Sequence, residues 1–177
     1  MKKIYLTIII VLVAIIGTYI FYQAGAGDQE TDIAEGIKEG INIGDKAPDF
    51  TLNKMNGDQI SLSELRGQKV FLNFWASWCG PCRIEMPDIQ KLHNEHEEIS
   101  ILAVNVQEDN QTVVNFMMDN SYHFPVVLDK TGNISGKYAV RGLPTTYILD
   151  ENGVIMSKVS GVLSYERMLE LLEVNND

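Results

Sequence analysis

Continuous apolar runs of strand length alternate along the chain with segments in which apolar residues recur at helical spacing. The runs at residues 70–75 and 101–106 are almost free of polar side chains, which is typical of central strands buried on both faces. Helical spacing follows the first run over residues 79–95 and the second run over residues 112–120. This alternation predicts an α/β domain with a mixed central sheet flanked by helices.

Turn and capping signals predict two hairpins and a closing helix around that core. Asn56-Gly57 lies between two short apolar segments, and Asn-Gly is a strong local signal for a β-hairpin. Glu151-Asn152-Gly153 separates two further strand-like segments, and Ser164 is placed to cap a helix over residues 165–174. The strand-like segments outside the two central runs are residues 50–52, 60–62, 124–128, 145–149 and 154–156.

The N-terminus carries a separate apolar segment that predicts a membrane anchor. Lys2 and Lys3 precede an uncharged run over residues 4–22, which as a helix is long enough to cross the roughly 30 Å hydrocarbon core of a bilayer. The lysines predict a cytoplasmic N-terminus, so that one helix spans the cell membrane and the domain lies outside. A signal peptide cleaved near residues 24–26 is the alternative, although its apolar region is usually shorter than this run.

Three regions follow from these patterns. Residues 1–22 are expected to form the cytoplasmic lysines and the transmembrane anchor, or an uncleaved signal. Residues 23–42 are rich in Gly, Ala and acidic side chains and predict a flexible tether. Residues 43–177 form the predicted folded domain.

The chain has only two cysteines, Cys79 and Cys82, and a formal net charge of −10. The charge argues against nucleic acid as a partner, because phosphate binding requires clustered Lys and Arg. A disulfide between cysteines at i and i+3 closes no long loop and so adds little stability to the fold. The pair is therefore more suited to redox chemistry than to a structural role. At the start of a helix, backbone N–H groups and the helix dipole stabilise a thiolate. Cys79 is therefore the predicted nucleophile, and Cys82 is the predicted resolving thiol.

Three segments, in order, resemble one family. Phe74-Trp-Ala-Ser-Trp-Cys-Gly-Pro-Cys82 is similar to the active-site segment of thioredoxin-fold proteins. Gly44-Asp-Lys-Ala-Pro-Asp-Phe-Thr-Leu52 and Gly142-Leu-Pro-Thr-Thr146 resemble the N-terminal hairpin and the cis-proline loop of the TlpA/ResA-like branch. That branch consists of membrane-tethered, extracytoplasmic thiol–disulfide oxidoreductases. The resemblance covers residues 43–174.

The resemblance implies a thioredoxin-like fold with an N-terminal β-hairpin and a central insertion. It also assigns roles around the two cysteines. Pro144 is expected to follow a cis peptide bond beside the disulfide, and Leu143 to offer backbone hydrogen bonds to an extended substrate segment. Trp78 is expected to form an exposed platform where a partner docks.

One position departs from general thioredoxins, which carry a buried Asp two residues before the equivalent of Trp75. This chain has Asn73 there, which does not titrate. Glu85 lies three residues beyond Cys82 on the same helical face and matches a glutamate of the ResA-like branch. A partly buried carboxyl has a raised pKa and exchanges protons, so Glu85 is the predicted acid or base. The alternative is an ordinary solvated helix glutamate.

The resemblance predicts a monomeric reductase of protein disulfides, such as apocytochrome c during cytochrome c maturation. A membrane thiol donor would supply its electrons. No separate cofactor is expected, because the Cys79–Cys82 dithiol itself carries two electrons, and no metal is expected. Gly80 departs from the acidic residue that many apocytochrome-specific members have, which weakens the substrate assignment but not the reaction class.

Three alternatives share this fold. The first is an oxidising protein that installs disulfides. The second is a peroxidase, because Pro48-Asp-Phe-Thr-Leu52 also resembles peroxiredoxins, but Ala76 stands where their Thr-x-x-Cys motif has threonine. The third is a copper chaperone, which would bind metal at the two cysteines with a nearby histidine, and no His lies near either Cys in sequence.

Overall fold

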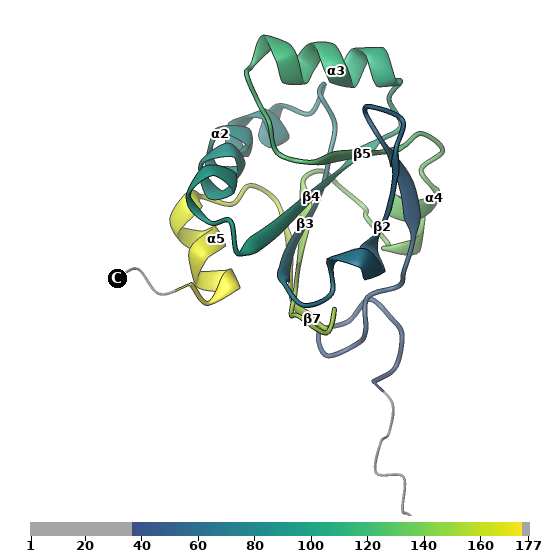
Figure 1. Cartoon of the computed structure of the whole chain (residues 1–177), viewed down its shortest axis with the longest axis vertical. Helices are drawn as coiled ribbons and strands as arrows, with labels where there is room; N and C mark the ends of the chain where they lie inside the picture. The colour runs from purple at the N-terminus through teal and green to yellow at the C-terminus, as the bar shows by residue number, and fades with distance from the viewer. Residues whose placement is uncertain (1–36, 175–177) are drawn as a thin grey trace, which may run out of the picture. The chain divides into compact units, whose positions relative to one another are not determined.

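The computed structural model describes residues 37–174 (Figure 1). The predicted membrane anchor and most of the predicted tether lie outside these residues. Within residues 37–174, no helix is long and apolar enough to cross a membrane. The elements are β1 (Thr51–Lys54), β2 (Gln59–Ser61), the 3₁₀ helix η1 (Leu62–Leu65), β3 (Lys69–Trp75), α2 (Gly80–Glu95), β4 (Ile99–Val106), α3 (Asn110–Asp119), β5 (Val126–Asp129), α4 (Asn133–Lys137), β6 (Thr145–Leu149), β7 (Ile155–Ser160) and α5 (Tyr165–Leu172).

All seven strands form one sheet in the order β2-β1-β5-β4-β3-β6-β7. The three central strands β5, β4 and β3 run parallel, whereas β1 pairs antiparallel with β5 and β6 pairs antiparallel with β3. The β1–β2 and β6–β7 hairpins close the two edges, as the turn signals predict. Gly57 sits in the first turn with a φ of 94°, a conformation that glycine adopts without steric cost. The predicted mixed α/β sheet is therefore confirmed.

Alternate side chains of β3 point into two separate cores. Phe71 and Trp75 face one core with the buried side chains of α2, α3 and α5. In Figure 1, α2 and α5 lie next to each other on this face, and α4 is on the other side of the sheet. Val70, Leu72 and Phe74 face the second core, which contains Phe50, Tyr138 and Tyr147. The aromatic rings of this second core pack at centroid distances of 5.2 to 6.2 Å.

The described part of the chain begins in a segment bound to the sheet edge. Lys46 N–H donates to the Lys38 carbonyl at 2.8 Å, and Gly40 N–H donates back to the Lys46 carbonyl at 3.0 Å. The Asp45 carbonyl in turn accepts from Ile155 N–H of β7 at 2.9 Å. Residues 38–46 are therefore tied by hydrogen bonds to one another and to the second hairpin.

The sequence patterns do not predict α4, a five-residue helix between β5 and β6. Two residues after the end of this helix, Ala139 has a left-handed conformation with a φ of 47°. Ala139 N–H donates to the Gly136 carbonyl and Val140 N–H to the Ser135 carbonyl, which is the paired hydrogen bonding of a Schellman motif. This arrangement fixes the direction in which the chain leaves α4 toward the Leu143–Pro144 loop.

Candidate active site

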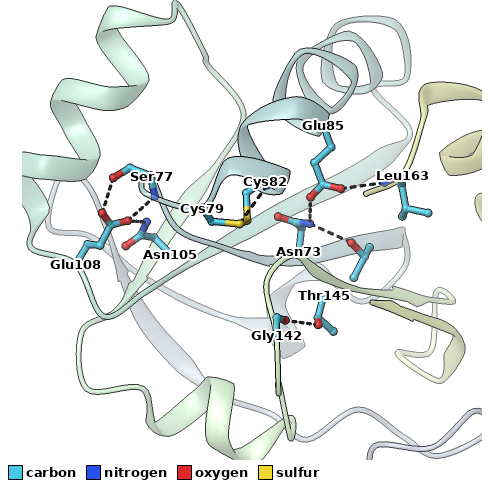
Figure 2. The surroundings of a disulfide bond; sticks show 11 residues. Asn73, Ser77, Cys79, Cys82, Glu85, Asn105, Glu108, Gly142, Thr145 and Leu163 are labelled. Carbon is cyan, nitrogen blue, oxygen red and sulfur yellow. Dashed lines mark hydrogen bonds between the residues drawn. A yellow bond between two sulfur atoms is a disulfide. The ribbon is translucent and has the colours of Figure 1, made fainter. Parts of the chain in front are cut away.

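The two cysteines lie at the N-terminus of α2, as their spacing predicts. β3 ends at Trp75, a short turn follows, and Cys79 is the N-cap residue of the helix. Cys79 and Cys82 form a disulfide with a Cα–Cα distance of 5.3 Å (Figure 2). The Cys79 sulfur also accepts a hydrogen bond from Cys82 N–H at 3.1 Å. In the reduced protein the same N–H and the positive end of the helix dipole face the Cys79 sulfur, where they favour a thiolate.

The two cysteine residues differ slightly in exposure. Cys79 retains 4% of its surface and Cys82 none, so Cys79 is the more accessible residue of the pair. Pro81 occupies the first turn of α2, where its missing N–H leaves no helical hydrogen bond unmade. This order of access agrees with the predicted roles of nucleophile and resolving thiol.

The predicted cis-proline is present. The Leu143–Pro144 peptide bond is cis, and Pro144 is buried. Thr145 Oγ1 donates to the Gly142 carbonyl at 2.8 Å, and Gly161 N–H donates to the Pro144 carbonyl at 2.9 Å, which fixes the loop on both sides. Trp78 is 70% exposed, and with Leu143 it lines a groove of about 260 Å³. The substrate-binding roles of Trp78, Leu143 and Pro144 stay predictions.

Glu85 lies on α2 beyond Cys82 and is completely buried, so it is not the solvated glutamate of the alternative interpretation. Asn73 Nδ2 donates to its Oε1 at 2.8 Å, and Leu163 N–H donates to its Oε2 at 3.1 Å (Figure 2). Burial raises the pKa of Glu85 from 4.5 to about 7, because the charged form loses its hydration. The two hydrogen bonds act in the opposite direction on this pKa, and the nearby charge of Asp88 raises it further.

The Asn73 amide is suited to both protonation states of that carboxyl. Its Nδ2 also donates to Thr146 Oγ1 at 3.0 Å, whereas its Oδ1 is buried without a partner. An amide presents a donor on one side and an acceptor on the other. In the structure, Asn73 Nδ2 donates to the Glu85 carboxylate. After a half-turn of the amide, Asn73 Oδ1 would accept the proton of the carboxylic acid. The Asn73 amide can therefore form a hydrogen bond with Glu85 in either protonation state.

A second carboxyl group holds the turn before Cys79, and the sequence patterns give no sign of it. Glu108, after β4, accepts hydrogen bonds from Ser77 N–H at 2.7 Å and from the Ser77 hydroxyl. Asn105 Nδ2 donates to the same carboxylate at 2.7 Å. Figure 2 shows the disulfide between this group and the Asn73–Glu85 group. Since 31 residues separate Ser77 from Glu108, only the pairing of β3 with β4 brings the two together.

A metal cluster is not part of this arrangement. Within the part of the chain that the structure describes, no three His, Cys, Asp or Glu side chains converge as ligands would. The polar groups around the disulfide are two amides, two hydroxyls and two carboxyls from different elements. Such groups are suited to holding and moving a proton.

Comparison with known proteins gives one family and a consistent set of relatives. The AhpC/TSA family model matches residues 43–158. The thioredoxin-like protein YneN of Bacillus subtilis is 41% identical over 140 residues, which are 77% of this chain and 82% of the relative. The thiol-disulfide oxidoreductase ResA of the same organism is 38% identical over 159 residues, covering 89% of this chain and 83% of the relative.

Solved structures agree. StoA from Bacillus subtilis has a TM-score of 0.62 at 34% identity, with 70% of this chain and 96% of that chain covered. A putative thiol:disulfide interchange protein DsbE from Chlorobium tepidum has a TM-score of 0.69 at 31% identity, with 75% and 99% covered. The predicted thioredoxin-like fold is confirmed by these similarities.

Proposed function

The chain belongs to the AhpC/TSA family and is a thiol–disulfide oxidoreductase of the ResA/StoA type, and from this premise we propose that it reduces disulfides of proteins outside the cell membrane. Apocytochrome c is the proposed substrate, and a membrane thiol donor returns the enzyme to its dithiol form. The apolar run at residues 4–22 anchors the domain.

The first step is attack by the Cys79 thiolate on one sulfur of the substrate disulfide. A bond forms between that sulfur and Cys79, the substrate disulfide breaks, and the second substrate sulfur leaves as a thiolate. The position of Cys79 as N-cap of α2 supports this assignment, because the Cys82 N–H at 3.1 Å stabilises the attacking anion.

The second step resolves the mixed disulfide. Cys82 loses its proton and attacks the Cys79 sulfur, which releases the substrate as a dithiol and closes the Cys79–Cys82 disulfide. Two electrons pass from the enzyme to the substrate. Glu85, one turn along α2 from Cys82 and with a pKa of about 7, is the group we assign to take that proton.

The buried Glu85 is the observation that carries the reducing direction. A strong disulfide oxidant has a stabilised reduced form. A carboxyl that is largely ionised above about pH 7 and lies one turn from Cys82 opposes thiolate formation there. The reduced form is therefore less stabilised, and the dithiol gives up its electrons more readily.

The test is the reduction potential of the Cys79–Cys82 pair in the full-length chain, equilibrated with glutathione buffers. A value near or below about −270 mV is expected for a reductase, and a value near about −120 mV would make the protein an oxidant. Glu85→Gln should shift the potential in the oxidising direction, because it removes the charge that opposes the thiolate. Glu97→Gln, the same change at an exposed position two residues after the end of α2, is the matched control.

The substrate and the location need tests of their own. Reduced full-length protein is mixed with oxidised apocytochrome c, and the appearance of haem-attachable thiols is followed by alkylation. Failure to reduce it at a competent potential would exclude this substrate and leave the reaction class intact. Alkylation of Cys79 in whole cells by a membrane-impermeant reagent tests the outward orientation, and protection of Cys79 in intact but not in lysed cells would contradict it.

A further inference from the structure

The groove beside the disulfide is built from two segments that already belong to the active site. Trp78, directly before Cys79, forms one wall, and Gly142-Leu143, directly before the cis-proline, forms another. Val106 and Val140 contribute apolar surface, and the groove measures about 260 Å³. A substrate segment whose sulfur reaches Cys79 therefore places a neighbouring side chain over this groove.

Among the residues that the structure describes, Arg141 is the only charged one that lines the groove. Its side chain is exposed, and within residues 37–174 it forms no salt bridge. The chain as a whole carries a net charge of −10, so Arg141 is an unpaired cation on a predominantly acidic protein. Arg83, directly after Cys82, differs because its guanidinium lies over the Phe116 ring at 5.8 Å. An acidic group is the chemical complement that Arg141 lacks.

The backbone presents Arg141 in a fixed direction. Two residues before it, Ala139 is left-handed, and the hydrogen bonds that end α4 are complete. One residue after it, the Gly142 carbonyl accepts from Thr145 Oγ1 at 2.8 Å. Gln107, which also lines the groove, has a positive φ of 58° as well, and its N–H donates to the Asp129 carbonyl at 3.0 Å. Left-handed non-glycine residues are uncommon and cluster at functional sites.

We propose that this groove is a specificity subsite that accepts an acidic side chain next to the reactive cysteine of the substrate protein, with Arg141 as its partner. The inference rests on the proposed function and deepens it, because it names the class of protein disulfide that the enzyme prefers. Arg141 is exposed, so the ion pair forms at the surface of the groove, and the side chain beside the substrate cysteine decides which disulfides react fastest.

The test isolates the first chemical step from the direction of electron flow. A full-length Cys82→Ser chain reacts with amidated peptides that each carry one cysteine as a mixed disulfide with 5-thio-2-nitrobenzoate. The Cys79 thiolate bonds to the peptide sulfur, and thionitrobenzoate leaves with the electron pair of the broken bond, so its absorbance gives the rate. The peptides differ only in having Glu, Gln or Lys beside the cysteine.

The Glu peptide should react about two- to fivefold faster than the Gln peptide, which is the range of an exposed ion pair, and the Lys peptide should react slowest. Arg141→Gln should equalise the three rates, and Arg141→Glu should reverse their order. Arg167→Gln on α5 makes the same change in net charge and should leave the order unchanged. Added salt should reduce the preference in the parent chain.

Two outcomes would overturn the inference. One is an unchanged Glu-to-Lys ratio in Arg141→Gln, and the other is an equal loss of that ratio in Arg167→Gln, which would indicate a long-range charge effect. The proposed function is tested separately by the reduction potential. An oxidising potential together with an unchanged peptide preference would contradict the proposed function and leave the subsite intact. If Cys79 reacts with none of the peptides, the thiol chemistry and the subsite are both wrong.

Discussion

Replacing Glu85 by glutamine should remove most of the fall in stability that the parent protein shows as the pH rises through neutrality. The pKa of Glu85 is 4.5 when unfolded and about 7 when folded. Below about pH 4.5 both states hold the proton and the full stability is present. Between there and about pH 7 only the unfolded chain loses it, so stability falls, and above about pH 7 the loss is complete.

The expected size of the effect follows from the same pKa values. Each pKa unit corresponds to about 1.4 kcal/mol, so the complete loss is about 3 kcal/mol, of which about 2 to 3 kcal/mol falls between about pH 5 and about pH 8. Glutamine keeps the shape of the buried side chain. Asn73 Oδ1 has no partner in the parent structure. After a half-turn of the Asn73 amide, this oxygen can accept a hydrogen bond from the side-chain amide introduced at position 85.

The assay is denaturant unfolding of the oxidised chain across this pH range, for the parent, Glu85→Gln and Glu97→Gln. The informative quantity is the difference between the parent and Glu85→Gln at each pH. Other carboxyls, such as Asp49 and Asp109, have lowered pKa values and titrate at acid pH in all three proteins, so they cancel in this difference. Parallel pH curves for the parent and Glu85→Gln would refute a titrating Glu85, as would an equal change in Glu97→Gln.

Three further substitutions have defined outcomes by the same unfolding assay. Ser77→Ala removes the hydroxyl that donates to Glu108 and should lower the free energy of unfolding by about 1–2 kcal/mol; no change would mean that solvent replaces this contact. Tyr138→Phe leaves the Pro48 carbonyl without its 2.6 Å hydrogen bond and should cost about 1–2 kcal/mol, and an equally stable variant would contradict a buried acceptor. Ala139→Gly removes the steric cost of a left-handed alanine and should raise stability by about 0.5–1 kcal/mol, whereas a loss would show that another contact holds this backbone.

Most of the regular structure follows from local signals in the sequence. The Asn56-Gly57 turn, the apolar strand predicted at residues 70–75 and the cap at Ser164 each depend on neighbouring residues only, and the structure confirms all three. The helix α4 is different, because it has five residues with Gly136 inside and no apolar period. Its position depends on the packing of Tyr138 in the second core, which no local pattern reveals.

The residues of the site also differ in how far the sequence alone predicts their positions. The positions of Cys79 and Cys82 follow from their spacing at a helix start, whereas the cis bond before Pro144 follows only from family resemblance. The contact between Leu163 and Glu85 cannot be predicted from the sequence. Leu163 is 78 residues away and donates through its backbone N–H, which every residue type except proline has. Contacts made by backbone groups across the fold leave no mark in the side-chain pattern.

The division of β3 between two cores has a consequence for how this protein can change. On one side of β3, Asn73 donates a hydrogen bond to the Glu85 carboxyl. On the other side, its neighbours Leu72 and Phe74 pack among aromatic rings. Val106 and Leu143, which line the groove beside the disulfide, also pack with this aromatic core, so its substitutions are not all neutral for the site. Substitutions away from these two residues, such as at Tyr147, should change thermal stability more than they change the hydrogen bonds of Glu85. Stability could then be adjusted to a hotter or colder environment with little effect on the buried carboxyl.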